Sequence, residues 1–306
     1  MARYLLKRLL FAIPVLLLAA FLVFSALHLA GGDPLTMLLG PGAPREVREA
    51  TRARLGLDKP IPVQFGIYLS QALRGDFGQS IISKSEVSEL IWQKLPITLE
   101  LGAASFFLAY FLGIPMGVIA AVNRNKFLDW FSMILALIGV SMAGFWLGLV
   151  LMYIFGATLK WLPPTGYGGI KHLILPALAL AMPRVGQIAR ISRSSVLEVF
   201  HQDYIRTARA KGLTERVVVI KHAFRNALIP IISLMGLDLG YVFGGSVVIE
   251  SVFARPGIGF LMLKSIFSRD FPVLQGCMFV LAVAIILSNI LADIAYVIVD
   301  PRIRHQ

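Results

Sequence analysis

The sequence predicts an all-α polytopic membrane protein with six transmembrane helices and both termini in the cytoplasm. Of its 306 residues, 57% are hydrophobic and only 15% are charged, which is a more apolar balance than soluble domains have. Several uncharged runs reach the roughly 20 residues that a helix needs to cross the hydrocarbon. The net charge of +12 comes from residues that lie mainly beside these runs, so membrane topology explains it better than nucleic-acid binding does.

Five apolar runs pass the length test, at residues 9–30, 97–122, 130–157, 228–249 and 276–299. The first run begins like a secretory signal peptide. It is too long for one, however, and His28 stands where a small residue would precede cleavage. We therefore expect a retained membrane anchor. Gly113, Pro115 and Gly117 are expected to bend the second crossing, whereas Gly144 and Gly148 are expected to let the third pack closely.

The fourth crossing begins at His172 and is interrupted by Pro183 and Arg184. Further polar residues follow at three-residue steps on one helix face, at Gln187, Arg190 and Arg193. A helix rises about 1.5 Å per residue, which places Arg184 near the middle of the bilayer. Segments interrupted in this way line a cavity rather than face lipid, so we expect this one to border a polar route.

Four parts follow from this order: an N-terminal transmembrane helix (1–31), an extracytoplasmic helical loop (32–95), a transmembrane domain (96–299) and a short cytoplasmic tail (300–306). The loop is turn-rich and has helical patterns at 44–55, at 62–73 and from Ser85. We favour a small helical cap on the membrane domain. A contact surface for a delivery protein is the alternative.

Parity supports this topology. With the N-terminus inside, six crossings place every short basic segment in the cytoplasm: Arg124 with Lys126, the cluster between Arg206 and Arg225, and Arg302 with Arg304. The loop at 32–95 then lies outside in spite of its arginines. Long loops are exempt from the positive-inside tendency.

The basic loop at 200–226 combines small residues with a single glycine. Its central run is Thr207, Ala208, Arg209, Ala210, Lys211 and Gly212. We expect a short helix kept slim by Ala208 and Ala210, so that it can enter a groove on another protein. Gly212 supplies the turn at low steric cost, and Thr214 is expected to cap a second helix. That helix should bury one apolar face, made of Val217, Ile220, Phe224 and Leu228.

These residues resemble the cytoplasmic loop of ABC importer permeases, and within that family the dipeptide, oligopeptide and nickel permeases. The pattern continues with Arg225-Asn226-Ala227 and Pro230, although Thr207 stands where the family often has Glu. Other stretches agree with the same family. They are Gly32-Asp33-Pro34, Leu55-Gly56-Leu57-Asp58, Gly75-Asp76-Phe77-Gly78, and the run with Glu250, Pro256, Gly257, Gly259, Asp270 and Pro272.

The resemblance implies a type I ABC importer permease fold in the cell (inner) membrane. Its loop would hold the coupling helix, which sits in a cleft of an ATPase subunit. The coupling residues carried over are Tyr204, Thr207, Ala208, Arg209, Ala210, Lys211 and Gly212. The partners implied are a second permease subunit, often a non-identical homologue, two cytoplasmic ATPase domains and an extracytoplasmic solute-binding protein. Lipid surrounds the chain, and no nucleic-acid partner is expected.

The chain is expected to carry no cofactor and to be no enzyme. It contains no Gly-x-x-x-x-Gly-Lys-Ser/Thr loop for phosphate, so ATP and Mg would be bound by the partner ATPases. Its single cysteine, Cys277, has no metal-ligand partners, and the histidines are scattered. This favours short peptides as cargo, with glutathione or nickel as alternatives in the same family.

The polar residues inside the crossings are the candidates for the translocation pathway: Arg184, Gln187, Asp238 and Asn289, with Asp293 nearer the cytoplasm. A central Arg or Asp costs about 2.5–3.5 kcal/mol on insertion scales, so each should face protein or water. Two hypotheses stay open. Arg184 and Asp238 either line the passage and meet the termini of a zwitterionic peptide, or neutralise each other and hold the bundle together.

Two other classes fit less well. Intramembrane aspartyl proteases carry glycine beside the catalytic aspartate, whereas Asp238 lies between Leu237 and Leu239. A secondary transporter would need two inverted halves. Here the first half contains a long outer loop and the second a basic inner loop, so the halves differ.

Overall fold

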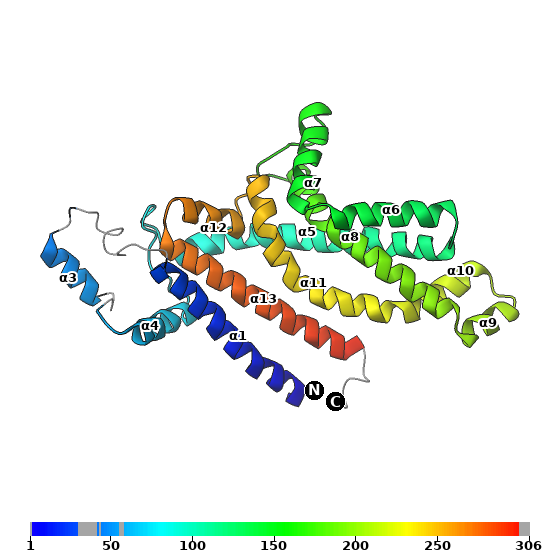
Figure 1. Ribbon diagram of the computed structural model, residues 1–306, viewed down its shortest axis with the longest axis horizontal. Coiled ribbons are helices and arrows are strands. Elements are labelled where there is room, and N and C mark those ends of the chain that lie inside the picture. The colour runs from blue at the N-terminus through cyan, green and yellow to red at the C-terminus, as the bar shows by residue number, and fades with distance from the viewer. Residues whose placement is uncertain (1, 30–41, 43, 55–57, 300–306) are drawn as a thin grey trace.

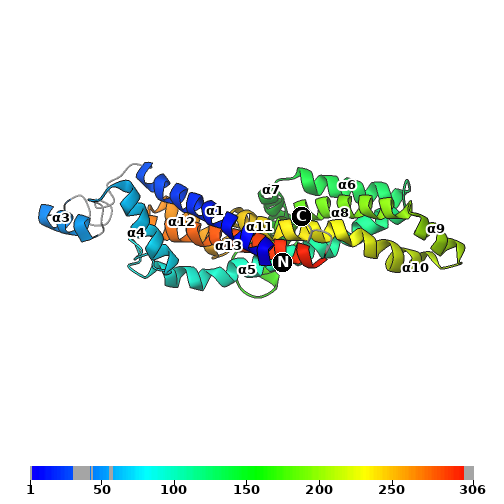
Figure 2. The same cartoon turned by 90° about the horizontal axis from the view of Figure 1, so that it is seen from below.

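The computed structural model describes residues 2–29, 42, 44–54 and 58–299, and in this part of the chain it is α-helical with two π-helical segments. The molecule is elongated, with the short helices α9 and α10 at one end and α3 and α4 at the other (Figures 1 and 2). The predicted basic loop and the predicted long loop therefore lie at opposite ends. The motif residues 32–34 and 55–57 and the tail 300–306 lie outside the described residues.

The first helix, α1 (Ala2–Leu29), packs along the last, α13 (Phe271–Val299), as Figure 1 shows. The predicted helices of the long loop are present as α3 (Arg45–Arg54) and α4 (Ile61–Leu73). Aromatic contacts hold α4 in place, because the Phe65 ring lies 5.5 Å from that of Phe21 and the Tyr68 ring lies 6.5 Å from that of Phe279. The loop is thus anchored on α1 and α13.

The second crossing is longer than expected. The helix predicted from Ser85 and the crossing predicted at 97–122 form one 36-residue helix, α5 (Val87–Val122), which contains Pro96 and Pro115. At 1.5 Å per residue it is about 54 Å long, well beyond a hydrocarbon core of about 30 Å. Its first turns therefore reach the outer cap.

The third crossing is wrong as a single straight helix. The chain forms α6 (Phe127–Ser141) and α7 (Gly144–Leu151), and α7 continues as a π-helix, η1 (Met152–Thr158). The two pieces are bent by 107° at the break, and Figure 1 shows α7 projecting from the bundle. Met142 and Ala143 adopt extended backbone angles there, which ends the helical hydrogen bonding. An apolar run carries no signal for such a break.

The fourth crossing, in contrast, is unbroken: α8 (Lys171–Phe200) is a 30-residue helix that contains Pro176 and Pro183. Our expectation of an interrupted segment is wrong at the level of the backbone. Pro183 cannot donate a hydrogen bond to the carbonyl four residues earlier. That carbonyl, of Ala179, lies against Gly144, where an added Cβ would be 3.1 Å away. The close packing expected at Gly144 and Gly148 is confirmed by these contacts and by Phe253, 2.9 Å from the Cβ position of Gly148.

The glycines of α5 serve packing against α8. A Cβ on Gly113 would lie 2.8 Å from Cβ of Ile188, and one on Gly117 would overlap the carbonyl of Ala189. On the other side of α8, Gly186 approaches the carbonyl of Ala136 in α6 just as closely. Helices α5, α6 and α8 therefore form one closely packed group.

A second group is formed by α11 (Arg225–Val252), α12 (Ile258–Phe267) and α13. Four helices in the described residues are long and apolar enough to cross a membrane, or five if the bent pair of α6 and α7 counts as one crossing. The described apolar part of α1, residues 10–25, is shorter than that criterion. The all-α, multi-pass class is confirmed, and the count of six with both termini inside stays a prediction.

Candidate functional sites

The basic loop folds as predicted into a short helix, a glycine turn and a second helical segment. The short helix is α9 (Asp203–Ala210), and Gly212 follows it with φ of +77°. The second segment begins as α10 (Glu215–Val217) and continues as a π-helix, η2 (Val218–Phe224), directly into α11. The loop thus connects α8, which ends at Phe200, with α11, which begins at Arg225.

One face of α9 is fixed to the chain itself. Ile205 and Ala208 are buried, and they pack against Val218 and Ala223. The Tyr204 hydroxyl accepts a 2.8 Å hydrogen bond from Nδ2 of Asn226. These contacts tie α9 to the segment that continues into α11.

The opposite face of α9 is open to solvent. The exposed residues are Thr207, Arg209, Ala210, Lys211 and Gly212. Arg209 is held by a 2.7 Å hydrogen bond from Nε to Glu215, and its guanidinium lies 5.4 Å from the Phe200 ring. Of the seven predicted coupling residues, Ala208 alone is buried, while Tyr204 and the five on this face are exposed.

Three details of the loop differ from expectation. Ala208 faces inward, so its small side chain brings α9 close to its own chain rather than into a groove on another protein. Thr214 occupies the N-cap position of α10 but makes no side-chain cap hydrogen bond. The predicted apolar face of the second helix is wrong as well: Ile220 is 67% exposed, whereas Val219 and Ala223 are buried. A π-helix bonds i to i+5, which rotates the side chains away from the 3.6-residue period.

The second candidate site lies inside the bundle, where α5, α8 and α11 meet. Nη1 of Arg184 lies 3.0 Å from Oδ1 of Asp238, and it also donates a 2.6 Å hydrogen bond to Gln187. The Tyr110 hydroxyl donates a 2.7 Å hydrogen bond to Oδ2 of Asp238. The guanidinium carbon of Arg184 stands 3.5 Å from the ring centroid of Tyr241. These five side chains form what we call the Arg184 cluster.

The sequence correctly indicated three members of this cluster, Arg184, Gln187 and Asp238. Asn289 is exposed and makes no hydrogen bond with the described residues of the cluster. It faces Gly240, where an added Cβ would lie 2.7 Å from its Oδ1. The side chain of Asp293 lies outside the described residues. Sequence reasoning missed Tyr110 and Tyr241. Tyr241 follows Asp238 by three residues, a spacing that places both on one helix face and could have indicated it.

A polar cluster around the buried Arg255 and Glu250 joins the two helix groups. Arg255 is fully buried, and its Nη2 donates a 2.6 Å hydrogen bond to Glu100 at the start of the membrane part of α5. Glu250 is buried too, and accepts a 3.1 Å hydrogen bond from the backbone N–H of Phe260 in the first turn of α12. A carboxylate at a helix N-terminus is stabilised by the unpaired N–H groups there. This explains the Glu in the run at 250–272.

The same run binds the first-loop motif. Asp270 accepts hydrogen bonds from the Ser80 hydroxyl, at 2.5 Å, and from the Ile81 N–H, at 3.1 Å. Phe77 packs against the core of α5, α12 and α13. Two motifs that lie almost 200 residues apart in the sequence thus meet at one place, at the end of the membrane domain opposite the basic loop (Figure 1).

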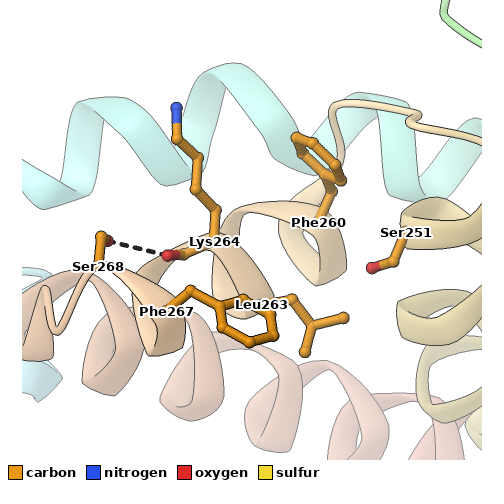
Figure 3. Close-up of a pocket in the computed structure, with 6 residues that line it drawn as sticks. All are labelled: Ser251, Phe260, Leu263, Lys264, Phe267 and Ser268. Atoms are coloured by element: carbon orange, nitrogen blue, oxygen red, sulfur yellow. Dashed lines mark hydrogen bonds between the residues drawn. The ribbon is translucent and has the colours of Figure 1, made fainter.

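A shallow hollow of about 460 Å³ lies between α11 and α12 (Figure 3). Its lining residues are Ser251, Phe260, Leu263, Lys264, Phe267 and Ser268. Figure 3 shows that Lys264 extends away from Leu263 and Phe267, so the side chains do not converge on a common point. The arrangement has no set of polar groups that would orient a small molecule.

Long apolar helices, a charge cluster inside the bundle and an exposed basic helix at one end are features of a multi-pass α-helical membrane protein. Two family models agree and between them cover most of the chain: the binding-protein-dependent transport system inner membrane component over residues 113–305, and the N-terminal membrane component of such systems over residues 1–102. The chain belongs to this family, the permease subunits of ABC importers in the peptide and nickel group.

Several known proteins are similar to this chain. The glutathione transport system permease protein GsiC of Salmonella typhimurium strain LT2 is 44% identical over 306 residues, which is 100% of both chains. A protein provisionally named peptide transport system permease of Brucella abortus strain 2308 is 44% identical over 314 aligned positions, again covering 100% of both. A chain of the MetNI methionine ABC transporter, solved in inward-facing conformations, matches with a TM-score of 0.59 at 20% identity, covering 69% of this chain and 96% of that one. This last likeness shows the type I importer permease fold.

Membership in this family establishes the role of the chain. It is a non-catalytic permease subunit of an ABC importer, a multi-pass membrane protein that acts together with other ABC transporter subunits. ATP hydrolysis belongs to a separate subunit of such systems. The basic inner helix and the Arg184 cluster are thus features of a transport machine rather than of an enzyme.

Proposed function

We propose that this chain forms one half of the translocation pathway for short peptides in the cell (inner) membrane, paired with a second, homologous permease subunit. A solute-binding protein delivers the cargo outside, and two cytoplasmic ATPase domains bind ATP and Mg. Relatives named as peptide and glutathione transport permeases match over the whole chain, which supports peptides as cargo. Glutathione, itself a small peptide, is the second candidate.

The observation that carries the proposal is the construction of α9. Its inner face is buried on its own chain through Ile205 and Ala208, while Arg209, Ala210 and Lys211 are exposed at the end of the molecule. A helix with one face packed on its own chain and the other exposed is suited to bind a partner whose movement it then transmits. We infer that the ATPase contacts this exposed face, and that α8 and α11 carry its movement to the Arg184 cluster.

Nucleotide-driven closure of the ATPases would then open the pathway outward, and hydrolysis would return it inward. In this proposal Arg184, Gln187, Asp238 and Asn289 border the route. Arg184, Gln187 and Asp238 lie about one helix half-length from the coupling loop. Arg184 and Gln187 of α8 form one polar cluster with Asp238 of α11. The contacts of this cluster would therefore change when α8 and α11 move apart.

Reconstitution tests the proposal. The full complex, purified with its second permease, ATPases and binding protein and placed in liposomes, should import labelled trialanine or glutathione only when ATP is supplied. A cysteine in place of Lys211 should form a crosslink with the ATPase, whereas one in place of the exposed outer Arg74 should not. Uptake by the purified chain alone without ATP would contradict the proposal and favour a secondary transporter.

A further inference from the structure

We propose that Arg184 recognises a carboxylate of the transported substrate through the guanidinium edge formed by Nε and Nη2. The inference rests on the proposed function, because it names the chemical group that the cargo presents to the pathway. It assigns recognition to Arg184 alone and a positioning role to Asp238, Tyr110 and Tyr241. The sequence-based hypothesis, in contrast, let Arg184 and Asp238 meet opposite ends of a zwitterion.

The internal contacts of Arg184 use only one of its nitrogens. Nη1 makes both the 3.0 Å ion pair with Asp238 and the 2.6 Å hydrogen bond to Gln187. Nε is buried and has no hydrogen-bond partner among the described residues. Nη2 takes part in neither of these two contacts, and the side chain is 21% exposed. A guanidinium carries five N–H donors in a planar fork, and its Nε–Nη2 edge matches the two oxygens of a carboxylate.

An unused edge of this kind calls for an explanation. Buried donors without partners are rare in proteins, because each loses its bonds to water and gains none in return. The guanidinium of Arg184 lies over the ring of Tyr241, with its carbon 3.5 Å from the ring centroid. The ring fixes the plane of the fork, so the edge is oriented before any substrate arrives.

Asp238 is placed differently. It is 3% exposed, its Oδ2 accepts the Tyr110 hydroxyl at 2.7 Å, and its Oδ1 faces Arg184 at 3.0 Å. Oδ2 is thus hydrogen-bonded to the chain itself, whereas Oδ1 accepts no hydrogen bond from the described residues and is neutralised by the ion pair with Arg184. A substrate ammonium would have to displace two neighbours at once. The geometry therefore gives Asp238 the task of holding Arg184 charged and in place.

The edge is closed in the present conformation. The cavity at the cluster measures about 10 Å³, which is near the lower limit for a single water molecule and too small for a carboxylate. Arg184 belongs to α8 and Tyr241 to α11, the two helices that flank the coupling loop. Movement of that loop would separate them and uncover the edge. Free peptides and glutathione both carry the carboxylate that this edge would bind.

The test compares cargo pairs that differ in one terminus. Complexes reconstituted with ATP, and with binding protein at saturating concentration, are supplied with trialanine, trialanine amide or N-acetyltrialanine. A second pair is glutathione and its diethyl ester. For each protein the ratio of uptake of the free acid to that of the blocked form is measured. Dividing the ratio of a variant by that of the wild type cancels the preference of the binding protein.

For Arg184→Gln we expect this relative ratio to fall about tenfold, because a charged bidentate contact is lost. Arg184→Lys keeps the charge but lacks the fork, so its ratio should fall by a smaller factor. Asp238→Asn should lower uptake of all cargoes together. It should leave the preference for a free over an acetylated N-terminus unchanged. The matched control is Arg190→Gln, an exposed arginine on the same helix, which should leave every ratio as in the wild type.

Other outcomes would overturn the inference. If Arg184→Gln lowers acid and amide uptake by the same factor, Arg184 serves only to hold the bundle together. If that variant fails to assemble with its partners, the Arg184→Lys ratio decides, and an unchanged ratio contradicts carboxylate recognition. A wild-type complex that imports neither trialanine nor glutathione contradicts the proposed function itself, and the inference falls with it.

Discussion

Gly212 illustrates how one residue can limit the coupling loop. Its backbone has φ of +77°, in the left-handed region, while an added Cβ would meet nothing within 4 Å. The constraint is therefore on the backbone and not on space. The branching of the side chain at Cβ therefore matters more than its size, and residues that tolerate the left-handed region should be accepted.

We expect Gly212→Val to uncouple ATP hydrolysis from uptake, because a β-branched residue in the left-handed region costs roughly 1–3 kcal/mol and the turn after α9 would change. Gly212→Asn is the matched control, since Asn visits this region readily, and it should retain near-normal coupling. The measurement is the number of ATP molecules hydrolysed per peptide imported, with membrane insertion checked in parallel. Equal ratios for Val and Asn would show that the turn geometry is irrelevant.

At the scale of single residues, the sequence indicated which charged side chains lie inside the membrane, but not which residues they contact. Arg184 and Asp238 were recognisable because charged side chains inside a membrane are unfavourable unless they face protein or water. That Tyr110 and Tyr241 complete the cluster was not recognisable, since a tyrosine in an apolar run is common. The same applies to the buried Arg255, whose partner Glu100 lies 155 residues away.

Among the helices, α8 is the element around which the others are packed. On one side of α8, the Ala189 carbonyl lies where a Cβ on Gly117 of α5 would be. On the other side, the Ala136 carbonyl of α6 lies where a Cβ on Gly186 of α8 would be. A bidentate ion pair adds to this, because Arg193 of α8 donates hydrogen bonds of 2.6 and 2.7 Å to Asp129 of α6. We therefore expect α5, α6 and α8 to move as a unit.

This packing predicts that Gly186→Ala destabilises the membrane domain by about 1–3 kcal/mol, because the methyl group would overlap the Ala136 carbonyl and a backbone cannot rotate aside as a side chain can. Gly244→Ala in α11 is the control. Nothing lies within 4 Å of its Cβ position, so the usual gain of helix propensity should leave stability equal or slightly higher. Thermal unfolding of the purified complex in detergent measures both. A stable Gly186→Ala variant would mean that α6 and α8 can slide apart without loss.

Over the whole molecule, the two motifs that resemble the same family prove to be neighbours. Ser80 of the first loop and Asp270 of the run at 250–272 share a hydrogen bond. The basic loop lies at the far end of the molecule (Figure 1). This arrangement is the one that the proposed relay of movement across a membrane requires.

Topology can be tested directly on this architecture. Cys277 is buried, so a Cys277→Ser background should behave like the wild type. In that background, a cysteine at the exposed Arg74 should react with a membrane-impermeant maleimide in intact cells. A cysteine at the exposed Arg206 should react only after the membrane is opened. Labelling of Arg206→Cys from outside would contradict the predicted orientation, and with it the proposed contact with cytoplasmic ATPases.

Much of this protein follows from local chemistry alone. Hydrophobic length determined the membrane class, the small residues around Gly212 determined a helix–turn–helix loop, and the cost of charge in hydrocarbon indicated Arg184, Gln187 and Asp238. These are properties of short segments, so a short segment suffices to read them.

Only the tertiary structure decided which surfaces meet. It turned Ala208 inward, rotated the face of the second coupling segment through a π-helix, broke the third crossing by 107° and kept the fourth continuous through Pro183. It also left Nε of Arg184 without a hydrogen-bond partner among the described residues, while Oδ2 of Asp238 bonds Tyr110 and Oδ1 pairs in charge with Arg184. The reason is that backbone breaks and hydrogen-bond partners depend on helices distant in sequence, whose approach no local pattern records.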